Sequence, residues 1–410
     1  MLEQKLGPRY RLVIVGACFL MVFVCLGFCS SSKSLYLAAI TEALGIRRSL
    51  FSINDSCRYI ATAVVNLFFG ALCARFGLKR LIGAGFACLI LSMLCYAFAP
   101  SIGWFYLGGV LLGLGLAWTT TTVVGCIVHR WCPEHAGKTM GFILAANGIG
   151  AAAAAQIVTP IIYEPGNPFG YQNAYKLVAL ILAVTALIVL LLYREKPGAA
   201  AAGKEKTPKT DWPGLSFSEA RKSGTFYLAL VCIFFTGFVL QGATGVSSAH
   251  MKDVGLDAGF VGTVVSVHAL CLTAFKFLTG VLHDRAGLRK TMLLCDAAAI
   301  AALLLLAGMN AQGRVQALCY GALSSLALPL ETIMLPLVTG DLFGARDYDK
   351  LLGILVSVNT AGYAFGTPIT NWAFDRFGTY RPALLASCGV MLAVTACFQL
   401  LLRKSAKARQ

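Results

Sequence analysis

Long hydrophobic runs, each separated from the next by a short polar segment, follow one another along nearly the whole chain. A helix needs about 20 apolar residues to cross a bilayer core of ~30 Å. Since the runs reach that length, they predict membrane-spanning helices. Twelve runs are found, at about 11–38, 49–73, 80–99, 102–127, 139–163, 174–193, 224–248, 259–282, 291–309, 315–342, 351–373 and 382–402. We therefore expect an all-α membrane protein with twelve transmembrane helices.

The longest polar segment lies between the sixth and seventh runs. Residues 194–223 are rich in Ala, Gly, Lys, Pro and Ser, a composition typical of linkers. We predict an N-terminal six-helix bundle in residues 1–193, a cytoplasmic linker in 194–223 and a C-terminal six-helix bundle in 224–410.

The two halves of the chain repeat each other. Gly70-Ala-Leu-Cys-Ala-Arg-Phe-Gly-Leu-Lys-Arg80 matches Gly280-Val-Leu-His-Asp-Arg-Ala-Gly-Leu-Arg-Lys290 at an offset of 210, between the second and third run of each half. A second match, at an offset of 212, pairs Lys138, Gly141, Asn147 and Gly150 with Lys350, Gly353, Asn359 and Gly362. Duplicated halves are typical of transporters that bind their substrate between the two repeats, near the middle of the membrane.

Composition agrees with a membrane protein. Of the 410 residues, 58% are hydrophobic and 13% charged, and the mean hydropathy is +0.75, which leaves too little charge for the surface of a soluble protein. The net charge of +16 excludes no partner by itself, but nucleic-acid binding needs a basic face, and these cations lie between the apolar runs. If the N-terminus is cytoplasmic, 24 of the 34 Lys and Arg residues fall on that side, seven on the other and three within helices. The positive-inside rule then predicts two cytoplasmic termini, and we expect the plasma (inner) membrane.

Cysteine and histidine patterns indicate no metal or cofactor. The fifteen cysteines are scattered through the apolar runs without a CxxC spacing, which favours a packing role. His129, Cys132 and His135 lie near one another but lack a fourth ligand. Paired acids, a Ser/His set and a phosphate-binding loop are also missing, so the sequence does not predict an enzyme.

The repeated loop carries a family pattern, G-x-L-x-D-R-x-G-x-R/K-R/K. At these residues the sequence resembles the major facilitator superfamily. The second copy is complete, whereas the first has Ala74 in place of the acid, which in the family latches one conformation by pairing with the other half. The resemblance implies a role in conformational change for Gly70, Arg75, Gly77, Lys79 and Arg80 in the first copy, and for Gly280, Asp284, Arg285, Gly287 and Arg289 in the second.

A narrower resemblance is to the monocarboxylate transporters and the oxalate/formate exchangers. It rests on three segments, residues 27–37, 130–141 and 276–280. The sequence departs from that branch where Lys276 replaces the usual Arg, and Leu272 replaces an Asp of the animal members. Thr360 stands near the place of a second lysine in the oxalate exchangers. This resemblance implies a carrier of small organic anions.

Two lysines inside spans are the main candidates for an anion site. A lysine at the middle of a spanning helix costs ~2.5 to 3.5 kcal/mol on insertion scales, so it needs a polar cavity or a partner. Lys33 follows a run of serines in the outer half of its helix, where it either binds substrate or extends to the outer headgroups. Lys276 lies in an otherwise apolar stretch. One ammonium from each half, facing a shared cavity, would attract a carboxylate.

Other ionisable residues within the spans have two interpretations each. Asp55 and Arg58 are spaced for an ion pair within one helix, and Arg58 either belongs to such a pair or contacts substrate. Glu331, between two prolines, either carries a proton or makes a structural hydrogen bond. His268, two turns before Lys276, either titrates in the same cavity or packs as a hydrogen-bond donor. His250, by contrast, is expected in an exposed outer loop.

Several uncharged polar and aromatic residues also lie within spans, where they either contact substrate or hold helices together. They are Trp118, Asn147, Gln241, Asn359 and Tyr363.

The sequence therefore predicts alternating-access transport of a lactate- or pyruvate-class monocarboxylate with a proton. The candidate proton carriers are, in order, Glu331, Asp55, His268 and Lys33 itself. Anion exchange, or a dicarboxylate bound by both lysines and Arg58, is the alternative. A sensor derived from a carrier is disfavoured, because the linker and tail are short. We expect a monomer in the bilayer that uses no cofactor, metal or nucleic acid.

Overall fold

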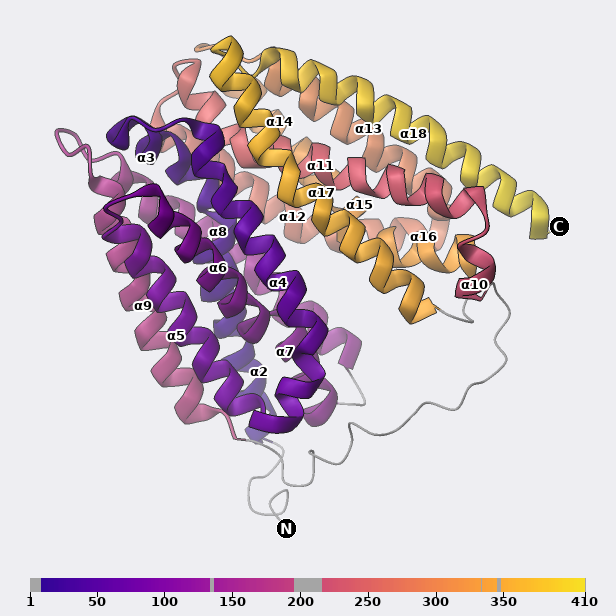
Figure 1. The fold of residues 1–410 in the computed structure, drawn as a ribbon, viewed down its shortest axis with the longest axis horizontal. Helices are drawn as coiled ribbons and strands as arrows, with labels where there is room; N and C mark the ends of the chain where they lie inside the picture. Colours follow the sequence, from indigo (N-terminus) through magenta and orange to yellow (C-terminus); the bar gives the residue numbers. More distant parts are fainter. Residues whose placement is uncertain (1–8, 133–135, 195–215, 333, 345–347, 410) are drawn as a thin grey trace. The chain divides into compact units, whose positions relative to one another are not determined.

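The computed structural model describes residues 9–132, 136–194, 216–332, 334–344 and 348–409. These residues form helices and no strand. They divide into two compact units (Figure 1). The first comprises Met1–Ile46 and Ile53–Thr207, and the second comprises Arg47–Ser52 and Pro208–Gln410. Most of the predicted linker, residues 195–215, lies outside the described part.

The first unit begins with a spanning segment whose helical type changes three times. Its elements are α2 (Arg9–Val22), η1 (Phe23–Ser31), η2 (Lys33–Leu35), α3 (Tyr36–Leu44), α4 (Arg48–Phe76), α5 (Leu78–Ala97), α6 (Ile102–Thr119), α7 (Thr121–Trp131), α8 (Ala136–Ile162) and α9 (Gly170–Leu192). The first turn of α4 belongs to the second unit.

The second unit contains both long and short helices. Its elements are α10 (Phe217–Ala220), α11 (Gly224–Asp253), α12 (Ala258–Ala286), α13 (Leu288–Ala307), α14 (Arg314–Ala327), α15 (Pro329–Thr332), α16 (Met334–Phe343), α17 (Tyr348–Phe377) and α18 (Arg381–Arg409). A capping box of Ser216 and Glu219 starts α10.

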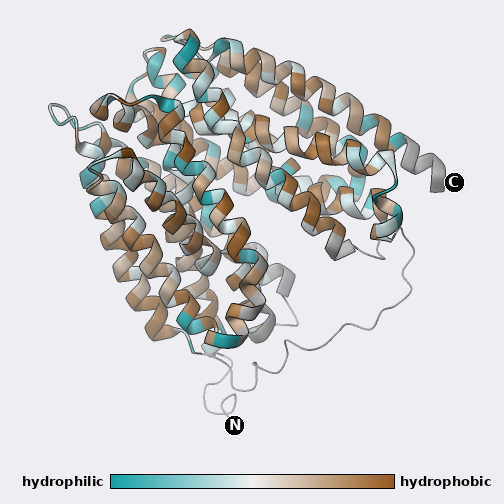
Figure 2. Cartoon of the chain, in the orientation of Figure 1, coloured by the Kyte–Doolittle hydropathy of each residue, from teal (hydrophilic) through white to brown (hydrophobic). Residues whose placement is uncertain are grey.

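The helices fit the dimensions of a membrane. Among the described residues, ten helical segments are long and apolar enough to cross a bilayer, and the bent segment formed by α14 to α16 gives an eleventh. The 29-residue α4 completes the twelve predicted segments. Hydrophobic residues cover most of the helix lengths (Figure 2). Large side chains such as Leu12 (72% exposed) and Phe277 (77% exposed) face outward, which suits lipid contact.

The repeated loop folds in the same way in both units. Gly77 precedes α5 with φ +78° and ψ 158°, and Gly287 precedes α13 with φ +80° and ψ 163°. Only glycine adopts this backbone conformation readily, so the motif requires glycine at both turns. The basic residues of the motif are exposed: Arg75, Lys79, Arg80, Arg285 and Arg289. The side chain of Asp284 and the packing of Gly70 lie outside the described part, and Gly280 lies within α12.

The second repeat marks the same helix contact in both units. A Cβ atom on Gly150 of α8 would lie 2.1 Å from the carbonyl oxygen of Phe23, and one on Gly362 of α17 would lie 2.2 Å from that of Phe234. Both distances are too short for any side chain. The repeat therefore preserves a close approach of α8 to η1 in the first unit and of α17 to α11 in the second.

Candidate substrate-binding site

A change of helix type shapes the first spanning segment around Lys33. The π-helix η1 ends at Ser31, and the 3-10 helix η2 begins at Lys33. Such departures from α-helical hydrogen bonding are frequent at functional sites. The hydroxyl of Ser32 donates to the carbonyl of Phe28 over 2.6 Å, which satisfies one group at the junction. Because the segment continues to Leu44, beyond the expected end near residue 38, Lys33 lies within it and not at its end.

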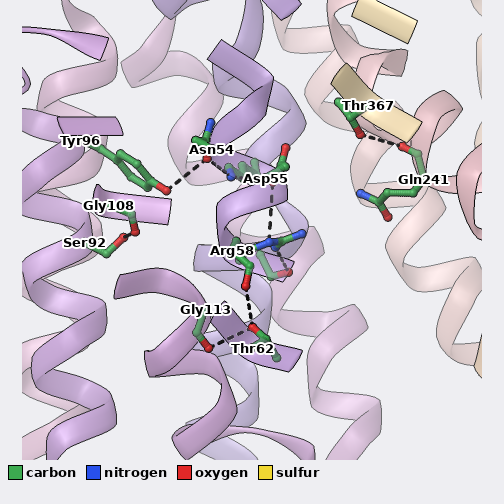
Figure 3. A network of polar contacts seen from close by, with 12 residues as sticks. Asn54, Asp55, Arg58, Thr62, Ser92, Tyr96, Gly108, Gly113, Gln241 and Thr367 are labelled. Carbon is green, nitrogen blue, oxygen red and sulfur yellow. Dashed lines mark hydrogen bonds and ion pairs between the residues drawn. The ribbon is translucent and has the colours of Figure 1, made fainter. Parts of the chain in front are cut away.

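The ammonium of Lys33 is held by Asn54 and Asp55, two neighbouring residues of α4 (Figure 3). Its Nζ lies 2.6 Å from Oδ1 of Asp55 and also donates to Oδ1 of Asn54. The hydroxyl of Tyr96 donates to the same Asn54 oxygen over 3.3 Å, and the Tyr96 ring centroid lies 6.0 Å from the ammonium. The Lys33 side chain is only 10% exposed. It is therefore a buried cation with a carboxylate, an amide and an aromatic ring around it.

Arg58 adds a second cation to this network. Its Nε lies 3.7 Å from Oδ1 of Asp55, which is the ion pair that the sequence spacing permits. Its Nη1 donates to the hydroxyl of Ser30 in η1 over 2.9 Å, and its guanidinium lies 4.2 Å from the ring of Tyr59. With Lys33 and Arg58 charged and Asp55 ionised, the network carries a net charge of about +1. A buried network with excess positive charge attracts anions.

Two glycines of α6 hold α4 in place beneath the network. A Cβ atom on Gly109 would lie 2.4 Å from the carbonyl oxygen of Asn54, and one on Gly113 would lie 2.3 Å from that of Arg58. The hydroxyl of Thr62 donates to the carbonyls of Arg58 and Gly113, over 2.9 and 3.0 Å. The missing side chains therefore let α6 lie directly against the polar face of α4.

Three predicted residues come together in the second unit. Glu331 lies on α15, in the bent segment, and Lys276 of α12 acts on its carboxyl electrostatically. Tyr363 of α17 is close enough to interact with the carboxyl group of Glu331, whose Oε1 is buried without a hydrogen-bond partner among the described residues. This group thus brings an ammonium and a carboxylate within electrostatic range of each other in a poorly solvated place.

His268 lies in the contact between α12 and α14. Its Nδ1 is 2.8 Å from the hydroxyl of Ser324 and 3.2 Å from the carbonyl of Gly321. These contacts hold two helices together. Lys276 is also close enough to interact electrostatically with the imidazole ring.

The expectation for His250 is wrong. This residue is 2% exposed, and its Nε2 lies 2.9 Å from the carbonyl oxygen of Leu306. The reason is that α11 continues to Asp253, so His250 lies inside a helix and packs against the end of α13.

The uncharged candidates make mostly helix-to-helix contacts. Asn147 accepts a hydrogen bond from the Ser31 hydroxyl over 3.1 Å, and Asn359 donates to the carbonyl of Ile233 over 3.1 Å. The backbone carbonyl of Gln241 accepts from Thr367 (Figure 3). Trp118 has a buried Nε1 without a hydrogen bond in the described part of the chain.

Sequence reasoning did not single out Asn54 or Asp296. Asn54 adjoins Asp55, and its partner Lys33 lies 21 positions away, so only its polarity within a spanning run could have indicated it. Asp296 is an acid in the ninth apolar run, and it is 1% exposed in the structure. The presence of an acid within an apolar run was the sequence signal that could have identified Asp296.

Some predictions lie beyond the described structure. The shared cavity for Lys33 and Lys276 stays a prediction, as does the latching role of the loop motif. His135 and the side chain of His129 lie outside the described residues. Within those residues, no group of three His, Cys, Asp or Glu side chains is placed to hold a metal ion.

The family follows from the sequence as a whole. A family model described as Major Facilitator Superfamily matches residues 18–257 and 229–410. The chain belongs to this superfamily. It is thus a multi-pass integral membrane protein of a transporter family, with the fold expected from the sequence.

Relatives and solved structures support that assignment. Monocarboxylate transporter 13 of Bos taurus is 26% identical over 331 residues, which cover 79% of this chain and 73% of the relative. The oxalate:formate antiporter of Oxalobacter formigenes is 22% identical over 272 residues, covering 65% of this chain and 62% of the antiporter. A mutant of the nucleoside transporter NupG shares the fold, with a TM-score of 0.80 at 12% identity over 96% of this chain and 99% of that one.

Proposed function

We propose that the chain is a secondary active transporter that moves a small organic anion, a monocarboxylate of the lactate or pyruvate class, together with a proton. The observation that carries the proposal is the buried Lys33 network, in which two cations face one carboxylate. Relatives named as monocarboxylate and oxalate:formate transporters, at low identity, support the same class of substrate.

In the first unit, a substrate carboxylate competes with Asp55 for the ammonium of Lys33. Binding one monovalent anion brings the net charge of the Lys33 network from about +1 to about zero. Neutralising a buried charge is favourable when water is excluded, because Coulomb attraction is stronger at low dielectric. A neutral or cationic solute gains nothing from this network.

In the second unit, the electrostatic interaction of Lys276 with Glu331 supplies a reason for proton coupling. An ionised Glu331 offsets the charge of the Lys276 ammonium, and a second carboxylate beside it would be repelled. Protonating Glu331 removes this repulsion and leaves the ammonium for the substrate. Anion and proton then bind together, which is symport.

Anion exchange is the second candidate. Arg58 favours it, because a second cation beside Lys33 would suit a dicarboxylate, and one relative is named as an oxalate:formate antiporter. An exchanger moves labelled anion rapidly only when unlabelled anion is present on the opposite side of the membrane.

Uptake by proteoliposomes tests the proposal. Purified protein is reconstituted, and uptake of labelled lactate is measured with and without an inward proton gradient. We expect accumulation only with the gradient. Uptake that ignores the gradient but needs anion on the opposite side would support exchange, and the absence of transport with mono- and dicarboxylates would contradict both. The proposal includes a monomer in the plasma membrane with cytoplasmic termini.

A further inference from the structure

Asp296 is a buried acid that the anion site does not use. It lies in the middle of α13 and is 1% exposed. Its Oδ2 is buried and has no hydrogen-bond partner among the described residues. Thr395 of α18 is the polar side chain that interacts with the carboxyl group. A carboxyl oxygen buried without a partner is destabilising, so its position requires an explanation.

A small cavity adjoins Asp296. It lies between α11, α13, α15, α16, α17 and α18, and its polar lining consists of Asp296, Thr236 and Asn359. The space open to the centre of a water molecule is about 20 Å³, which is enough for about one water. The Thr236 hydroxyl donates to the carbonyl of Cys232 over 2.9 Å, so its oxygen can still accept a hydrogen bond from such a water.

Among the described residues, no positively charged side chain acts on Asp296. The titratable groups that interact with it are the thiols of Cys232 on α11 and Cys295 on α13, and Cys397 on α18 interacts in turn with Cys232. No basic side chain in the described part of the chain is among its partners. An ionised carboxylate without a counter-charge is costly in such a place, whereas a carboxylic acid is neutral and can donate a hydrogen bond.

The lining suits a proton better than a metal cation. Hard cations such as Ca²⁺ and Mg²⁺ take about six or more oxygen ligands, and three side chains around a water-sized space do not supply them. A proton needs only the carboxyl group itself and a water molecule through which it enters and leaves.

The cavity also adjoins the elements that carry the anion site of the second unit. Leu330 and Leu335, on the two sides of the bend between α15 and α16, both line it. Glu331 follows Leu330 directly, and Tyr363 lies one turn after Asn359 on α17. The cavity beside Asp296 is therefore lined by the same backbone segment that carries Glu331.

We propose that Asp296 is a proton-binding site of the second unit, which takes up and releases a proton through this water-sized cavity during the transport cycle. Its consequence for transport rests on the proposed function, whereas the protonation itself does not. Unlike Glu331, Asp296 has no ammonium partner in the described part of the chain, so it binds its proton without competing with the substrate for a cation.

Infrared spectroscopy tests the protonation without any substrate. Difference spectra between acidic and alkaline buffers are recorded on the full-length protein in detergent, and the carbonyl stretch of protonated carboxylic acids is followed. We expect a buried carboxylic acid band that is lost in Asp296→Asn but kept in Asp257→Asn, a matched change at the exposed N-cap of α12. A band that persists in Asp296→Asn overturns the proposal. If Asp296→Asn does not fold, loss of the whole band in Glu331→Gln overturns it.

Transport by the same variants tests the consequence. In proteoliposomes, we expect Asp296→Asn to retain lactate counterflow and to lose accumulation driven by a proton gradient, while Asp257→Asn retains both. Gradient-driven accumulation equal to wild type in Asp296→Asn overturns the inference. Accumulation driven by sodium and not by protons in the wild type also overturns it. A wild type that moves no organic anion contradicts the proposed function alone, because the infrared result then still decides the proton site.

Discussion

The ammonium of Lys33 lies 2.6 Å from Oδ1 of Asp55, a residue 22 positions later on another helix. The cation proposed to bind substrate is thus already paired when no substrate is present. A buried pair of this kind lowers the cost of keeping a lysine inside the membrane. It also means that substrate binding is an exchange of one carboxylate for another around the same ammonium.

The first prediction concerns the energy of this pair. Lys33→Gln leaves Asp55 buried without its closest cation, and removing one partner of a buried ion pair costs ~3 to 5 kcal/mol. The double variant Lys33→Gln with Asp55→Asn removes both charges, and we expect it to be more stable than Lys33→Gln alone. Thermal unfolding in detergent measures both effects. Additive losses in the double variant would contradict a direct interaction.

The second prediction concerns Lys276. We expect Lys276→Ala to remain folded in detergent and to lose the thermal stabilisation that lactate gives the wild type, because the anion loses its ammonium in the second unit. Lys290→Ala, at an exposed lysine in the first turn of α13, is the matched control and should keep that stabilisation. If lactate still stabilises Lys276→Ala, the assignment of this lysine is wrong.

The third prediction concerns pH. Glu331→Gln imitates the protonated carboxyl at every pH, so Lys276 is always available to the anion. Wild-type binding should weaken as the pH rises and Glu331 ionises, whereas binding by Glu331→Gln should stay constant over the same range. Lactate binding across a pH series measures the difference. A variant that weakens in parallel with the wild type would place the coupling proton on another group.

The twelve helices were predictable, because the bilayer forces every span to satisfy its own backbone hydrogen bonds and to show an apolar exterior. The turns at Gly77 and Gly287 were also visible, since the repeat records a conformation that glycine alone adopts readily. The π-helix before Lys33 was not, because hydropathy does not report which carbonyl each N–H pairs with. Hydropathy also does not report where helical hydrogen bonding ends, so the extension of α11 past His250 was missed.

The residues of the site could be predicted from the sequence, but which of them interact with one another could not. The spacing of Asp55 and Arg58 indicated an ion pair, which is present, but the closer partner of Asp55 is Lys33. That contact depends on how η2 packs on α4, and no local pattern encodes it. Asp296 was overlooked because a lone acid in an apolar run gains meaning only when its surroundings are known.

The last prediction concerns the packing beneath the Lys33 network. Gly113→Ala places a methyl group 2.3 Å from the carbonyl oxygen of Arg58, so α4 and α6 must separate. Overpacking of this kind costs ~1 to 3 kcal/mol, and it should also weaken lactate binding by moving Arg58, the second cation of the network, away from Lys33. Gly103→Ala in the same helix has its nearest neighbour 3.9 Å away and should change neither property. Thermal unfolding with and without lactate measures both, and equal behaviour of the two variants would show that the contact between α4 and α6 does not position the network.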